Sequence, residues 1–215
     1  MNADRRRRLF ERLAAERPDP RPELDYTGDF ELLIAVILSA QATDIGVNRA
    51  TGRLFPIART PAAMLELGED GVRECIRTLG LYNAKARNVI ATCERLVHEH
   101  GGTVPGTRAA LEALPGVGRK TAGVVLNIAF GEPTLAVDTH VFRVANRTGL
   151  GPGRTPGEVE RVLLRRVPRA YLQNAHHWLI LHGRYTCTAR RPRCGRCTIA
   201  SLCEFPDKPA GGSGE

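Results

Sequence analysis

The chain has 215 residues, of which 42% are hydrophobic, and this is enough to bury one sizeable core or two smaller ones. Its 31 lysine and arginine residues outnumber 23 aspartate and glutamate residues and give a formal net charge of +8. This excess favours a polyanionic partner such as nucleic acid, although a basic surface that only keeps the protein soluble explains it equally well.

The sequence shows no signal for export or for insertion into a membrane. Its first residues, MNADRRRRLFERL, carry charge where a signal peptide would be apolar. The longest apolar run, around 32–38, is far shorter than the roughly 20 residues that a membrane span requires. We therefore expect a cytoplasmic protein without a membrane anchor. In that reducing compartment, six cysteines, four of them crowded between Cys187 and Cys203, favour a metal centre over disulfides.

Taken in chain order, the predicted elements are helices. Apolar residues recur at three- and four-residue spacing, as in Leu9 and Leu13 or in Val159, Val162 and Leu163, while strand-like alternation is scarce. Proline and glycine separate these stretches into helices of ordinary length. We expect residues 5–8 to form a solvated arginine face on the first helix, with a phosphate-binding stripe as the alternative. The other uncertain segments are 134–137, whose composition also fits a short strand, and 209–215, expected to be disordered.

A glycine-rich turn spans Leu114 to Thr121, with the sequence LPGVGRKT, and leads into an apolar helix expected over 122–130. Glycine lets the backbone approach a ligand closely, and the amides at the start of the helix can bind a DNA phosphate without reading sequence. A Gly-x-Gly turn is a weak signal by itself, and the spacing of a P-loop is absent.

Lys120 is predicted to lie in the first turn of that helix, beside Arg119. The positive end of the helix dipole and the neighbouring guanidinium both disfavour the charged ammonium form of Lys120. A lysine nucleophile requires this, because only the neutral amine can attack. The plainer alternative is an exposed lysine that binds phosphate. Asp138 follows an apolar run and precedes a new helical pattern, so it is expected to cap a helix. A carboxylate near an amine nucleophile can also take its proton and stabilise positive charge on a sugar ring.

Four cysteines near the C-terminus form the pattern C-x6-C-x2-C-x5-C, namely Cys187, Cys194, Cys197 and Cys203. One short clip flanked by two single cysteines suits a [4Fe–4S] cluster better than zinc, which remains the alternative. Arg190, Arg191 and Arg193 lie between the first two cysteines, on a loop that a metal centre would hold in place for docking on phosphates. The other two cysteines, Cys75 and Cys93, are expected to be small buried hydrophobic residues.

These motifs together resemble the bacterial endonuclease III family of helix-hairpin-helix DNA glycosylases. The resemblance is carried by LSAQATD ending at Asp44, LPGVGRKTA, LAVDTHVFRVANR, HHWLILHGRYTC and the four cysteines, and it runs from about Leu24 to Cys203. It implies an all-α fold of two helical lobes. A six-helix barrel domain with the helix-hairpin-helix would occupy 22–133, and an iron–sulfur cluster domain would combine 1–21 with 134–208. The histidines of HHWLILHGRYTC are expected to be core or capping groups rather than ligands.

The resemblance also implies an activity, a base-excision repair enzyme that is both DNA glycosylase and AP lyase. Lys120 would attack C1′ of the deoxyribose at an oxidised pyrimidine in double-stranded DNA and form a Schiff base that permits β-elimination, with Asp138 assisting. The damaged nucleotide must leave the base stack, and Gln41 and Leu81 match family positions that insert into the duplex. The hairpin residues Gly116, Gly118 and Arg119 would bind the backbone. The expected partner is DNA with a damaged base or an abasic site, bound by a monomer associated with the nucleoid.

Two alternatives and one departure accompany this interpretation. An adenine-mismatch glycosylase of the same superfamily shares the hairpin, the aspartate and the cluster, but usually lacks a lysine at position 120. A non-catalytic DNA-binding protein with a structural metal would need neither Lys120 nor Asp138. The departure is Gly123, which stands where the family pattern has a larger polar residue, inside a helix where glycine costs roughly 1 kcal/mol relative to alanine. This difference leaves the substrate range open.

Overall fold

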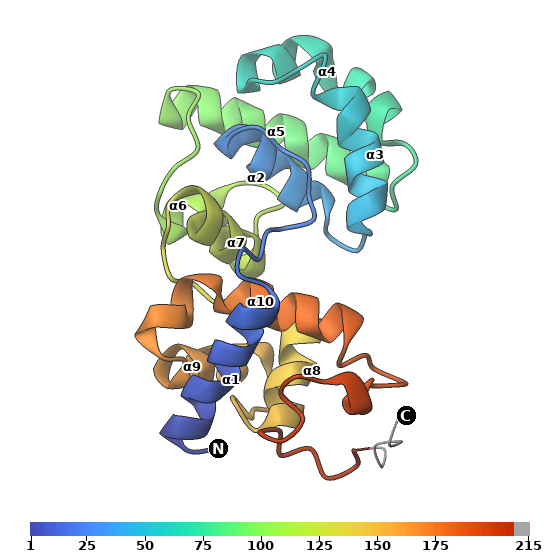
Figure 1. Cartoon of the computed structure of the whole chain (residues 1–215). Coiled ribbons are helices and arrows are strands. Elements are labelled where there is room, and N and C mark those ends of the chain that lie inside the picture. The colour runs from blue at the N-terminus through green and yellow to red at the C-terminus, as the bar shows by residue number, and fades with distance from the viewer. Residues whose placement is uncertain (209–215) are drawn as a thin grey trace. The chain divides into compact units, whose positions relative to one another are not determined.

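A computed structural model of the chain describes residues 1–208, and the described part consists of helices and connecting loops without a β-strand (Figure 1). The chain divides into two compact units. One is the continuous stretch Glu23–Glu132, here called the hairpin unit. The other, here called the cysteine unit, combines Met1–Pro22 with the chain from Pro133 onward. The expected all-α class is confirmed.

The hairpin unit contains six helices. They are α2 (Asp29–Leu38), α3 (Asp44–Leu54), α4 (Pro61–Ile76), α5 (Tyr82–His100), α6 (Arg108–Ala113) and α7 (Arg119–Ala129). Threonine side chains begin three of them, because the Oγ1 atoms of Thr43, Thr60 and Thr107 accept hydrogen bonds from backbone amides three residues on. Gly68 kinks α4, since its φ of +72° lies in the left-handed region that interrupts a helix.

The core of the hairpin unit forms around α2. Every residue from Glu31 to Leu38 is buried, so the longest apolar run of the sequence is a central helix. Helices α3, α5 and α7 pack on it. The buried side chains of α7, Ala122, Val125 and Leu126, contribute to the same core and fix the helix that follows the glycine-rich turn. Cys93 is fully buried in this core and Cys75 packs partly buried against it.

The cysteine unit joins the two ends of the chain. Its helices are α1 (Ala3–Glu16), α8 (Thr139–Thr148), α9 (Pro156–Arg166) and α10 (Leu172–Tyr185), with the 3₁₀ turns η1 (Arg169–Tyr171) and η2 (Cys194–Arg196). An aromatic cluster explains why α1 packs with the C-terminal half: Phe10 stacks on Tyr171 and both contact Trp178. The indole Nε1 of Trp178 also donates a 2.8 Å hydrogen bond to the carbonyl of Arg17.

The structure also bears on several local predictions from the sequence. Residues 134–137 form an irregular segment rather than a strand. On α1, Arg7 pairs with Asp4 and Glu11, in agreement with a solvated helical face. His176, His177 and His182 are buried. None of the helices in the described part is long and apolar enough to cross a membrane. The predicted disordered tail, 209–215, lies outside the described residues.

Candidate active site and metal centre

The glycine-rich turn connects α6 to α7, and a side chain of α5 holds it in place. Thr92 Oγ1 donates a 2.8 Å hydrogen bond to the carbonyl of Pro115, and the buried side chains of Leu114 and Val117 anchor the turn in the core. Gly116 has φ of +76°, and a Cβ atom built there would lie 3.0 Å from the side chain of Asn88. Both its conformation and its surroundings therefore require glycine.

Gly118 is the N-cap of α7 and supplies no side-chain acceptor, nor does the first turn contain an acidic residue. A Cβ atom on Gly118 would meet nothing within 4 Å, so the space in front of the helix is open. The first amides of α7 and the exposed Arg119 thus surround a place that suits an anion.

Lys120 follows in the first turn of α7 and is exposed. The full sequence contains only three lysines among its 31 basic residues. Lys85 is buried at 5% exposure. Lys208 donates hydrogen bonds to the carbonyls of Ala200 and Cys203, at 3.2 and 2.6 Å. Lys120 is therefore the one lysine whose amine is both accessible and without a protein acceptor in the described chain.

Asp138 is the N-cap of α8, where its Oδ1 atom accepts a 2.7 Å hydrogen bond from the amide of Val141. The capping role expected from the sequence is present. This bond fixes the side chain and leaves Oδ2 without a hydrogen-bond partner among residues 1–208. One carboxylate oxygen thus caps the helix, and the other is not used by it.

Two non-glycine residues of the described chain have positive φ, and they are Gln41 at +55° and Leu81 at +60°. Both are exposed, and Leu81 shows 62% of its surface although it is a large apolar residue. Left-handed backbone at such residues is costly and concentrates at functional positions. These are the two residues that the family resemblance predicted to insert into a duplex.

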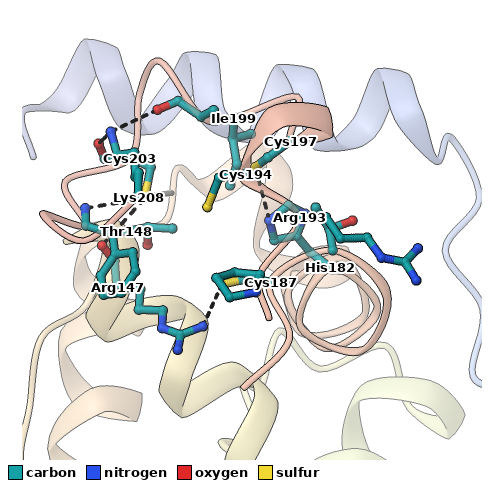
Figure 2. A pocket seen from close by; sticks show the side chains of 14 residues that line it. Arg147, Thr148, His182, Cys187, Arg193, Cys194, Cys197, Ile199, Cys203 and Lys208 are labelled. Carbon is teal, nitrogen blue, oxygen red and sulfur yellow. Dashed lines mark hydrogen bonds between the residues drawn. The ribbon is translucent and has the colours of Figure 1, made fainter. Parts of the chain in front are cut away.

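The four cysteines of the C-terminal motif line one pocket, together with residues from the ends of α8 and α10 (Figure 2). Hydrogen bonds reach three of the sulfurs. Arg147 Nη1 lies 3.6 Å from Sγ of Cys187, His182 Nε2 lies 3.6 Å from Sγ of Cys197, and the amide of Phe205 donates to Sγ of Cys203 at 3.4 Å.

Burial raises the pKa of the Cys197 thiol to about 11 and also raises the pKa of the Cys203 thiol. Without a cation these thiols stay protonated, and a bound metal would deprotonate them. Burial also lowers the pKa of His182 to about 4, so its ring is neutral near pH 7.

Within residues 1–208, no three cysteine, histidine or acidic side chains converge tightly enough to hold a single metal ion. A tetrahedral zinc site would bring its sulfurs to within roughly 4 Å of one another. An iron–sulfur cube binds each thiolate through a different iron and so needs a wider arrangement. Four cysteines around one pocket, three of them beside a hydrogen-bond donor, fit the larger group.

The loop between the first cysteines presents Arg190, Arg191 and Arg193, all of them exposed. Arg147 braces this loop, since its guanidinium donates 2.8 Å hydrogen bonds to the carbonyls of Thr188 and Ala189. Sequence reasoning missed Arg147 and His182, which lie in helices outside the cysteine motif. It also passed over Arg196, an exposed arginine inside the motif itself.

Sequence comparisons place these two regions in known families. The profile described as HhH-GPD superfamily base excision DNA repair protein matches residues 34–169. The profile described as iron-sulfur binding domain of endonuclease III matches residues 187–203. Endonuclease III from Escherichia coli K12 is 60% identical over 208 residues, which cover 97% of this chain and 99% of the relative.

This chain belongs to the endonuclease III family. The Haemophilus influenzae endonuclease III is 59% identical over 97% of this chain and 99% of its own length. A solved structure of a trapped endonuclease III–DNA covalent intermediate matches with a TM-score of 0.88 and 42% identity, over 95% of this chain and 96% of that one. A thermostable thymine-DNA glycosylase shares the fold, with a TM-score of 0.84 at 23% identity.

Membership in the endonuclease III family identifies the chain as a DNA-binding enzyme of base-excision repair, a DNA glycosylase with AP lyase activity. The family also carries the [4Fe–4S] cluster that the cysteine pattern predicted. Neither the adenine-mismatch glycosylase nor the non-catalytic binding protein is better supported. Gly123 is buried within α7, and nothing in the structure explains its departure from the family pattern.

Proposed function

We propose that this enzyme excises oxidised pyrimidines from double-stranded DNA through a Schiff base on Lys120, followed by β-elimination. The observation that carries the proposal is the isolation of Lys120 at the start of α7, directly after the glycine-rich turn. The other two lysines are buried or bonded to carbonyls. The abundant arginines cannot replace them, because a guanidinium stays protonated and is a poor nucleophile.

The reaction begins when the neutral Nζ of Lys120 attacks C1′ and the bond from C1′ to the damaged base breaks. The base leaves with the bonding electron pair and takes up a proton. The nitrogen then loses a proton, and the bond from C1′ to O4′ opens as O4′ takes up a proton, which leaves a protonated imine between Nζ and C1′. Removal of a C2′ proton then expels the 3′ phosphate and cuts the strand, and water hydrolyses the imine to restore the lysine.

Asp138 has two roles in this proposal. Its Oδ1 remains the cap of α8, which holds the side chain at one position. Its Oδ2 accepts the proton of the attacking amine and stabilises positive charge on the sugar as the base departs.

The remaining predicted residues bind and distort the duplex. The amides of Gly118 and Arg119 bind a phosphate, and the closely packed Gly116 sets the shape of that turn. Gln41 and Leu81 enter the stack and fill the space left by the extruded nucleotide, which costs least to extrude when the base is damaged or absent. Arg190, Arg191 and Arg193 dock on the backbone. We infer that the enzyme acts as a monomer among the DNA of the nucleoid.

Cys187, Cys194, Cys197 and Cys203 are the proposed cluster ligands. When bound, the cluster supplies a rigid link between the parts of the loop that carries the three arginines. The chain itself supplies the bracing contacts of Arg147 and the hydrogen bonds to three sulfurs.

Borohydride trapping tests the nucleophile. The protein is incubated with a duplex that contains one oxidised pyrimidine, the imine is reduced, and the adduct is mapped by peptide mass spectrometry. We expect one adduct on Lys120, none with Lys120→Gln, and slower formation with Asp138→Asn, which keeps a capping oxygen but loses the charge. Arg161→Gln, an exposed residue of α9 that has no role in the proposal, removes one positive charge and serves as the matched control.

An adduct on Lys85 or Lys208 would assign the chemistry to another amine and overturn the proposal. Full strand cleavage by Lys120→Gln would do the same. Adduct formation on abasic DNA but not on the oxidised base would restrict the proposal to the lyase step.

A further inference from the structure

His182 lies in the last turn of α10 and points into the cysteine pocket (Figure 2). The residue is 4% exposed. Its Nε2 atom lies 3.6 Å from Sγ of Cys197, and its Nδ1 atom has no hydrogen-bond partner among residues 1–208. The one polar contact of this buried ring is therefore a cysteine sulfur.

The position of the ring proton follows from these contacts. A neutral imidazole carries one N–H, on either nitrogen. With the proton on Nδ1, a buried donor would have no acceptor, which is unfavourable, and the Nε2 lone pair would face the sulfur. With the proton on Nε2, the ring donates to the sulfur and only a lone pair is left unsatisfied. A metal-bound thiolate has no proton of its own, so it can only accept.

We propose that His182 is a positioning residue for the iron–sulfur cluster, which donates its Nε2–H to the Cys197 thiolate and holds this ligand in place. The inference rests on the ligand set proposed above. It adds, beside the four ligands, a residue that holds one of them and that the cysteine spacing does not reveal.

The contact is one of four that give a ligand sulfur a donor. The others come from the Arg147 guanidinium on Cys187, the Phe205 amide on Cys203 and the Ile199 backbone amide, which also reaches Cys197. Hydrogen bonds to the sulfurs raise the reduction potential of such clusters, because they stabilise the more negatively charged state. His182 alone can be replaced without removing a charge or changing a backbone group.

The variants follow from the geometry. His182→Leu removes the donor and keeps an apolar side chain in the pocket. His182→Gln places an amide N–H close to the former position of Nε2. His177→Leu is the matched control, since His177 is buried on the same helix, has its pKa lowered to about 4 by burial, and does not line the cysteine pocket.

The readouts are the reduction potential of the bound cluster and the rate at which a chelator removes its iron. We expect His182→Leu to shift the potential to more negative values and to lose iron several-fold faster. His182→Gln should restore most of both properties, and His177→Leu should resemble the unmodified protein. Unchanged values in His182→Leu, or equal shifts in His177→Leu, would overturn the proposal.

A measurement on the unmodified protein decides the matter even if His182→Leu does not fold. In the cluster-loaded protein labelled with ¹⁵N-histidine, the ring nitrogen shifts of His182 should report the Nε2–H tautomer, and the Nδ1–H tautomer would contradict the proposal. Iron analysis comes first, because a protein without iron refutes the ligand set rather than the role of His182.

Discussion

The amine of Lys85 lies inside the hairpin unit and has no hydrogen-bond partner among residues 1–208. Its Nζ is buried, and burial lowers the pKa of this lysine. We expect Lys85→Met to raise the melting temperature at pH 7, because it fills the same space without an unsatisfied polar group. A gain of about 1 kcal/mol corresponds to about 2–4 °C for a protein of this size. Arg87→Met, on the exposed side of α5, is the control.

The effect of Lys85 should depend on pH in a definite direction. Its folded pKa lies below the unfolded value of about 10.4, so between the two values the unfolded chain binds more protons. The free energy of unfolding therefore rises with pH in this window and falls as the lysine charges. The advantage of Lys85→Met should shrink from pH 7 towards pH 10 in thermal melts. An equal gain at both pH values would contradict this cause.

At this scale the sequence predicted residues whose roles follow from local pattern. Asp138 was expected to cap a helix because it stands between an apolar run and a helical repeat, and the bond to Val141 confirms it. His182 and Arg147 could not be found in this way. They meet the cysteines only because α8 and α10 pack together, and sequence spacing does not encode that contact.

Alanine substitutions at the two glycines of the helix-hairpin-helix turn should have different effects. Gly116 combines φ of +76° with a neighbour 3.0 Å from an added Cβ, whereas Gly118 has φ of −93° and open space. Gly116→Ala should cost about 1–2 kcal/mol from its backbone alone and lower the melting temperature. Gly118→Ala should largely preserve stability but weaken DNA binding, since its methyl group occupies the approach to the amides of α7.

Melting curves and fluorescence-anisotropy titrations with duplex DNA distinguish the two cases. A stable Gly116→Ala protein would mean that the turn can rearrange around Asn88. Unimpaired DNA binding by Gly118→Ala would remove the start of α7 from the proposed phosphate site.

The elements themselves were accessible from sequence where apolar residues recur at three- and four-residue spacing, as in α1 and α9. The segment 134–137 was ambiguous because Thr134, Leu135 and Val137 also suit a strand. In the structure no neighbouring strand pairs with it within the described residues, and Leu135 is buried as an irregular link before α8. The kink at Gly68 was not predicted, since a single glycine does not reveal its φ.

At the scale of the whole molecule, each of the two units contains part of the predicted site residues. The hairpin unit contains Gln41, Leu81 and Lys120, and the cysteine unit contains Asp138 and the arginine loop. The chain passes from one unit to the other between Pro22 and Glu23 and again between Glu132 and Pro133. That the N-terminal helix belongs to the cysteine unit follows from Phe10 and Trp178, a long-range contact that composition alone could not have indicated.

Net charge predicts how this molecule binds DNA. Each arginine that contacts a phosphate of B-form DNA should contribute about 0.9 to the slope of log affinity against log salt concentration. Alanine at Arg190, Arg191 or Arg193 should reduce that slope accordingly, with similar losses on undamaged and damaged duplexes. Arg161→Ala, on α9, should leave it unchanged. A slope that stays constant in all three loop variants would exclude this loop from the interface.

The scarcity of lysine has a consequence for chemical reactivity. Acylating reagents that modify primary amines do not modify guanidinium groups, so most of the positive surface of this protein is inert to them. Among the side chains, Lys85 is shielded by burial and Lys208 is engaged by two carbonyls, which leaves the amine of Lys120 most open to attack. With the role proposed for Lys120, a general protein-labelling reagent would act on this chain much as a selective inhibitor does, and bound DNA would protect against it.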